Sequence, residues 1–143
     1  MIRRIGSDDI HDVMELLKQL WSDIQLESEE IKTISDIYIQ NDNHEIYCYE
    51  EQKVQGLITI TIRDAFYYGG KVAIIEDLIV DEKYRGQEIG RKLVEFVEKE
   101  LKQNGIRAIE LSSDLHRDQA YGFWEKMDYK RSAYQFRKNL NNR

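Results

Sequence analysis

The feature that most constrains this chain is an apolar stretch that runs into a polar, glycine-containing loop and then into an amphipathic segment. The apolar stretch covers residues 71–80, the loop 81–90 and the amphipathic segment 89–103, where hydrophobic residues recur at helical spacing. This order predicts a strand, a turn and a helix. Such a junction presents unpaired backbone N–H groups and the positive end of a helix dipole, so it suits an anion such as phosphate.

The remaining pattern predicts that all 143 residues form one α/β domain. A chain of this length is too short to divide into two parts that each bury a good core. Apolar spacing and turn residues predict two early helices, a hairpin, and a second strand–helix–strand series. The expected helices are 10–20, 29–39 and 117–127, and the expected strands are 2–5, 45–50, 54–63, 106–111 and 129–138, the last being one strand or a bent pair.

The charge is unevenly distributed. The chain has 21 Lys and Arg against 27 Asp and Glu, a net charge of −6. Residues 1–66 hold 14 acidic and 6 basic residues, whereas residues 67–143 hold 13 and 15. Nucleic-acid binding depends on dense Lys and Arg, so we expect no nucleic-acid partner. We expect the first half to attract a cation and to repel an anion.

Cysteine content and apolar runs bear on location. Cys48 is the one cysteine and cannot form an internal disulfide, which favours a cytoplasmic protein. The longest apolar runs are far below the roughly 18 residues of a membrane-spanning helix, so we expect no membrane partner. One cysteine and three scattered histidines cannot supply a structural zinc cluster, and we expect no metal.

Two stretches resemble the signatures of the GNAT N-acetyltransferases. Residues 75–90, IEDLIVDEKYRGQEIG, are similar to the acetyl-CoA-binding motif, a strand followed by Q/R-x-x-G-x-G/A. Residues 120–129, AYGFWEKMDY, are similar to the second signature, A-x-x-F-Y-x-x-x-G-F/Y. The resemblance is strong over 71–140 and weak over 1–66, where such enzymes build substrate specificity. It implies a mixed, mostly antiparallel sheet, splayed between two middle strands and flanked by about four helices.

The resemblance also implies where acetyl-CoA binds. Backbone groups of Leu78, Ile79 and Val80 would pair with the pantetheine arm as though it were an added strand. Main-chain amides of the following turn would hold the pyrophosphate, and a later helix would flank the pantetheine and the thioester. The turn residues are Arg85, Gly86, Gln87, Glu88, Ile89, Gly90 and Arg91, and the helix residues are Arg117, Ala120, Phe123 and Trp124.

Three residues depart from the family pattern. Glu88 replaces the middle glycine, and we expect its side chain to point to solvent because the turn acts through backbone N–H groups. Trp124 replaces a tyrosine that acts as general acid for the leaving CoA sulfur, and an indole N–H has no usable acidity. Tyr121, Tyr134 or a water molecule is the expected substitute. Asp128 replaces a turn glycine, which Asp tolerates because it adopts left-handed conformations readily.

The amine substrate needs a base. An amine with a pKa near 10.4 is protonated at neutral pH, and a nearby carboxylate can both bind the ammonium group and take its proton. Glu76 and Asp77 precede the pantetheine segment and should face opposite sides of their strand unless a bulge intervenes. We expect one of them to be the base and favour Glu76 over Asp77; a structural role for both is the alternative, and His116 is a weaker candidate.

The expected activity is acetyl transfer from acetyl-CoA to the primary amine of a small, cationic molecule, by direct attack on the thioester. One alternative acceptor is an aminoalkylphosphonate, for which Arg63, Lys71 and Arg131 are the candidate cations; another is a protein N-terminus. A third alternative is a non-catalytic acyl-CoA-binding sensor, which the departures at Glu88 and Trp124 motivate. Exposed edges in the final strands favour a homodimer.

Overall fold

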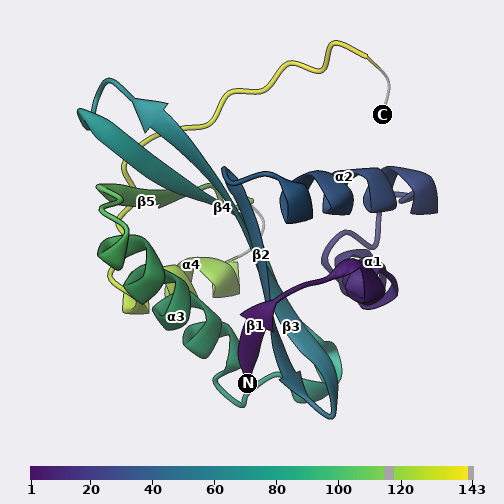
Figure 1. Cartoon of the computed structure of the whole chain (residues 1–143). Helices are drawn as coiled ribbons and strands as arrows, with labels where there is room; N and C mark the ends of the chain where they lie inside the picture. The colour runs from purple at the N-terminus through teal and green to yellow at the C-terminus, as the bar shows by residue number, and fades with distance from the viewer. Residues whose placement is uncertain (115–117, 142–143) are drawn as a thin grey trace. The chain divides into compact units, whose positions relative to one another are not determined.

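Consecutive strands lie side by side in one sheet, in the order β1-β2-β3-β4-β5 (Figure 1). The first four pair in antiparallel fashion, and β5 runs parallel to β4. This mixed sheet confirms the expected α/β fold class. The structure is a computed structural model that describes residues 1–114 and 118–141. The strands are β1 (Ile2–Arg4), β2 (His44–Glu51), β3 (Lys53–Ala65), β4 (Gly70–Val80) and β5 (Ala108–Leu111).

The chain divides into two compact units, Met1–Leu111 and Ser112–Arg143. In the first unit, α1 (Ile10–Leu20) and α2 (Ser28–Gln40) cover one face of the sheet, and α3 (Ile89–Gln103) covers the other (Figure 1). α1 and α3 each bury a stripe of apolar residues at helical spacing, as amphipathic helices do, whereas the buried residues of α2 are Ile31 and Ser35. No helix of the two described ranges is long and apolar enough to cross a membrane.

Alternation along the strands distributes residues between two cores. Ile46, Cys48 and Leu57 belong to the cluster that packs with α1 and α2. Tyr47, between the first two, faces the other way, and its ring lies 5.2 Å from that of Phe96 on α3, measured between centroids. Cys48 is fully buried in this cluster.

The second unit contains α4 (Asp118–Lys126), close to the helix expected there. The expected final strand over 129–138 is wrong, because these residues form neither strand nor helix. A strand requires a partner that takes up its backbone N–H and C=O groups, and no described segment pairs with residues 129–141. Their side chains are correspondingly exposed, including the apolar Tyr134 and Phe136.

Gly56 allows α3 to lie close to the sheet. It is paired with Val80, the last residue of β4. A Cβ atom on Gly56 would lie 3.1 Å from Cγ2 of Ile89 and 3.2 Å from the carbonyl oxygen of Ile79. The missing side chain therefore lets Ile89, the first residue of α3, pack directly against the backbone of β3 at Gly56.

We expect Gly56→Ala to lower the free energy of unfolding by about 1–3 kcal/mol, because the added methyl group overpacks this contact. Urea denaturation followed by circular dichroism measures the change. Gly122→Ala is the matched control: Gly122 lies within α4, and a Cβ there would meet no atom within 4 Å. Alanine at that helical position should raise the free energy of unfolding by about 0.5–1 kcal/mol. Equal effects of the two variants would contradict the close packing at Gly56.

Candidate active site

A β-bulge interrupts the pairing of β3 and β4 at Glu76. Thr59 lies opposite Asp77, but the next residue, Ile60, lies opposite Ile75, so Glu76 has no partner on β3. An inserted residue reverses the alternation of side chains along a strand. Asp77 therefore shares a face with Thr59, toward α1 and α2, whereas Ile75 lies on the α3 face. The sequence allowed for a bulge that would break the alternation at Glu76 and Asp77, and the structure contains one.

Asp77 is held by a hydrogen bond to the neighbouring strand. The Thr59 hydroxyl donates to Asp77 Oδ2 at 2.5 Å. Burial raises the pKa of Asp77 above its usual range; the Thr59 hydrogen bond opposes this shift, and the negative charge of Glu76 adds to it. A carboxylate with a raised pKa accepts protons more readily, which is the property that a general base needs.

Tyr38, from the inner side of α2, lies beside the carboxylates. Burial is the largest influence on its hydroxyl and raises its pKa. Hydrogen bonding to Thr61 and Thr59 lowers that pKa, and the charges of Glu76 and Asp77 raise it. The site thus brings together the acidic pair of β4 and the hydroxyl groups of α2 and β3.

His44 is a further polar residue on this face of the sheet. Thr61 Oγ1 lies 3.2 Å from His44 Nδ1, and the His44 and Tyr38 rings are 4.6 Å apart between centroids. Sequence reasoning assigned no role to Tyr38, Thr59 or Thr61. The available signal was the alternation of the two threonines with apolar residues in β3, which places both hydroxyls on one face.

The edge of β4 that faces β5 becomes free beyond Ile75. Pairing with β5 covers Val72 to Ile75, whereas pairing with β3 continues to Val80. In the described part of the chain, residues 76–80 therefore have a strand on one side only. This is the edge at which Leu78, Ile79 and Val80 are predicted to pair with pantetheine, because an open edge accepts an extended ligand as an added strand.

The turn before α3 contains two left-handed residues, Gly86 with φ 83° and Glu88 with φ 67°. Glu88 is the N-cap of α3, and the first helical hydrogen bond runs from the Lys92 N–H to the Glu88 carbonyl at 3.0 Å. The N–H groups of Ile89, Gly90 and Arg91 thus belong to the first helical turn, where N–H groups have no helical acceptor. N–H groups of this kind suit an anion, and this is the turn at which pyrophosphate is predicted to bind.

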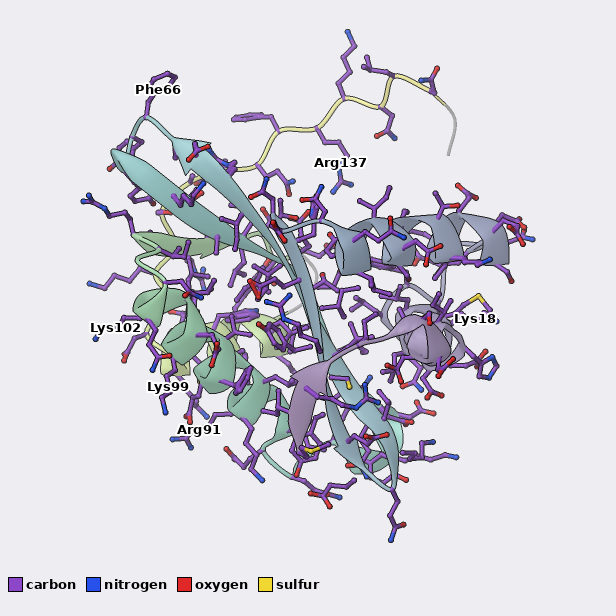
Figure 2. All side chains as sticks on the ribbon, viewed as in Figure 1. Lys18, Phe66, Arg91, Lys99, Lys102 and Arg137 are labelled. Atoms are coloured by element: carbon purple, nitrogen blue, oxygen red, sulfur yellow. The ribbon has the colours of Figure 1, made fainter. Side chains whose placement is uncertain are left out.

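The side chain of Glu88 lies at the surface, as expected. It is 63% exposed and pairs with Arg91 at 3.4 Å. Arg91 also pairs with Glu95 at 2.7 Å, so two carboxylates offset its charge. Arg85 Nε donates to the Val80 carbonyl at 3.0 Å, which ties the turn to the end of β4. Figure 2 shows Arg91, Lys99 and Lys102 projecting outward from α3.

The later signature lies in the second unit. The Tyr121 hydroxyl donates to the Asp114 carbonyl at 2.6 Å. The Trp124 ring lies 5.0 Å from Phe123 and 5.1 Å from Tyr129, between centroids, which favours a space-filling role for the indole. Ala120 is half-buried on the same helix. The predicted Arg117 and His116 lie outside the described residues.

The model of the acetyltransferase (GNAT) family matches residues 10–129. The chain belongs to this family. The GNAT assignment makes it an acetyl-CoA-dependent N-acetyltransferase, as the two sequence signatures implied.

Two relatives of this GNAT protein share about a third of the aligned residues. It is 32% identical to an aminoalkylphosphonate N-acetyltransferase of Salmonella typhimurium over 88 residues, which cover 62% of this chain and 57% of that enzyme. It is 30% identical to a glucosamine 6-phosphate N-acetyltransferase of Arabidopsis thaliana over 138 residues, which cover 92% of this chain and 90% of that enzyme. The fold is shared with a Bacillus halodurans protein described as a transcriptional regulator, at 22% identity, a TM-score of 0.90 and coverage of 98% and 99%.

We expect Asp77→Asn to stabilise the protein at neutral pH. The raised pKa means that, above the unfolded value of about 3.9, the folded protein binds more protons than the unfolded one, so wild-type stability falls as pH rises. Asparagine has no such ionisation. Urea denaturation at several pH values should therefore show the difference in free energy of unfolding growing in favour of the variant from about pH 4 upward.

Asp64→Asn is the control for this experiment. Asp64 is exposed and pairs with Lys71 at 3.0 Å, a type of surface ion pair that contributes about 0–1 kcal/mol. Its substitution should not reproduce the growing stabilisation. A stability difference for Asp77→Asn that stays constant across the pH range would show that burial does not disfavour its charge.

Proposed function

We propose that this GNAT enzyme transfers the acetyl group of acetyl-CoA to the primary amine of a small cationic molecule, by direct attack of the amine on the thioester. The observation that carries the proposal is Asp77, a carboxylate of raised pKa next to the point where β4 loses its neighbour β5. A base at this position adjoins the strand edge predicted for pantetheine.

The reaction begins with the ammonium group. Asp77 takes one of its protons, directly or through a water molecule, and the free amine then attacks the thioester carbonyl carbon. A C–N bond forms, the C–S bond breaks, and CoA leaves as a thiolate, while the nitrogen gives up its second proton to the departing sulfur or to water. A thiolate with a pKa near 8.5 is a good leaving group and needs little help from an acid. Because the thiolate needs so little help, the reaction can proceed although Trp124 replaces the tyrosine of the family pattern.

The two carboxylates have different roles in this proposal. Sequence reasoning favoured Glu76 as base, but the geometry favours Asp77. Asp77 is half-buried, bonded to Thr59 and raised in pKa, whereas the Glu76 side chain is exposed. An exposed carboxylate is suited to attract and bind the ammonium group, and the buried one is suited to take its proton.

The surrounding charges support a cationic acceptor. Residues 1–66 carry 14 acidic and 6 basic residues, which favours approach of a cation. The three cations considered for an anionic acceptor each have an acidic partner. Arg63 lies 3.7 Å from Glu110, Lys71 lies 3.0 Å from Asp64, and Arg131 lies 2.9 Å from Glu125.

A second candidate acceptor is an amine that carries a phosphonate or phosphate group. The observation that favours it is the pair of relatives, which act on an aminoalkylphosphonate and on glucosamine 6-phosphate. Such an acceptor keeps the same ammonium group and the same proton transfer to Asp77. It differs in needing basic groups to hold its anionic end.

We expect Asp77→Asn to lower kcat about 10²- to 10⁴-fold, the usual contribution of a general base, with little change in the KM for acetyl-CoA. Release of free thiol from acetyl-CoA in the presence of the amine measures this. Glu76→Gln, which removes the neighbouring charge, should chiefly raise the KM for the amine. A large loss of kcat in Glu76→Gln with unchanged kcat in Asp77→Asn would reverse the two roles.

An amine panel tests the acceptor class. Polyamines and aminoglycosides should give a higher kcat/KM than aminoalkylphosphonates and glucosamine 6-phosphate of similar size, because the acidic half attracts cations. Peptides with free N-termini complete the panel. A preference for the phosphorylated amines would support the second candidate. Acetyl-CoA binding by calorimetry with no turnover of any amine would favour a non-catalytic sensor.

A further inference from the structure

Thr59 is a hydroxyl residue in an otherwise apolar part of β3. Its side chain is 4% exposed, and its neighbours Ile58 and Ile60 are fully buried. A hydroxyl group in such a place is costly unless it is hydrogen-bonded. The partner of Thr59 is the Asp77 carboxylate on the adjacent strand, so this buried hydroxyl is committed to the proposed base.

The hydrogen bond distinguishes the two oxygens of Asp77. Among the described residues, the side-chain hydrogen bonds engage Oδ2, through Thr59, and not Oδ1. None of the buried side-chain polar atoms in that part of the chain lacks a partner. Oδ1, which has no such partner, is therefore not completely buried.

Further polar groups lie near Thr59. The Thr61 and Thr59 side chains lower the pKa of the Tyr38 hydroxyl, and Thr61 Oγ1 lies 3.2 Å from His44 Nδ1. Polar groups of α2, β2 and β3 thus lie on the same face of the sheet as the Thr59–Asp77 pair.

We propose that Thr59 positions Asp77 for catalysis: its hydroxyl holds Oδ2, so that Oδ1 is the atom that takes the proton from the substrate ammonium group. This inference rests on the proposed function, in which Asp77 is the base. Thr59 does not touch the substrate and loses no proton. It orients the carboxylate and stabilises its charged form.

The electrostatic effect of Thr59 can be separated from that of its surroundings. A hydrogen bond donated to a carboxylate favours the charged form, whereas burial and the Glu76 charge favour the neutral form. Two other titratable groups lie on this side: Tyr38 on α2, whose pKa is raised by the charge of Asp77, and His44 on β2, which contacts Thr61. Removing the Thr59 hydroxyl leaves these opposing influences in place.

Thr59→Val is the decisive variant, because valine has the shape of threonine without the hydroxyl. We expect the acid limb of log(kcat/KM) against pH to move to higher pH by about one to two units, from the loss of a hydrogen bond to a charged group. The NMR titration of the Asp77 side-chain carboxyl carbon, assigned by its loss in Asp77→Asn, should move by the same amount. Thr59→Ser, which keeps the hydroxyl, should restore both curves.

Thr61→Val is the matched control, since Thr61 lies two residues along the same strand and contacts His44 and Tyr38, not Asp77. It should leave the acid limb and the Asp77 titration in place. If Thr59→Val does not fold, Thr59→Ala removes the hydroxyl without added bulk and is measured in the same way. An unchanged Asp77 titration in the folded variant, or equal shifts for the two threonines, overturns the positioning role.

The NMR titration separates this inference from the proposed function. If Asp77→Asn keeps full activity, Asp77 is not the base and the base assignment within the proposed function fails, even where Thr59→Val moves the carboxyl titration. If Asp77→Asn is inactive but Thr59→Val moves neither curve, the base assignment stands and the positioning role fails. A shift in both curves, with rescue by serine, supports both.

Discussion

The irregular pairing at Glu76 is the constraint on which the candidate site depends. A strand with unbroken alternation would place Asp77 on the same face as Ile75, against α3, where the core is apolar. The extra residue moves Asp77 to the face of α2, opposite Thr59. The same part of β4 is where β5 ends its pairing, so one local irregularity coincides with both the carboxylates and the open edge.

The segment 76–80 links two kinds of chemistry. Its beginning carries the acidic pair, and its end leads into the N–H-rich turn that Gly56 brings close to the sheet. Four steps along a strand cover roughly 13 Å, at about 3.3 Å per residue. An extended cofactor lying along this edge would have its anionic end at the turn and its reactive end near the base. The negative charges of the acidic pair thus lie at one end of segment 76–80, and the positive end of the α3 dipole lies beyond the other.

The sequence could predict the elements of this fold and the two signatures, because these depend on local spacing. The strand, turn and helix over 71–103 are where we expected them, and the Glu88 side chain lies at the surface. The choice between Glu76 and Asp77 could not be predicted, since it depends on the register of β3 against β4. The Thr59–Asp77 contact joins residues 18 apart and follows from that register alone. The last strand was wrong for a related reason: alternation shows that a segment can pair, not that a partner is present.

Glu88 occupies a conformation that glycine adopts freely and other residues enter at a cost of roughly 1–2 kcal/mol. The family pattern has glycine at this point, so the chain retains local strain that an achiral residue would relieve. Because glutamate has fewer accessible backbone conformations than glycine, this loop samples fewer shapes. A ligand that selects the observed shape then orders less backbone on arrival, and the entropy lost at binding is smaller. At Glu88, the backbone is therefore more rigid before a ligand binds than it would be with glycine.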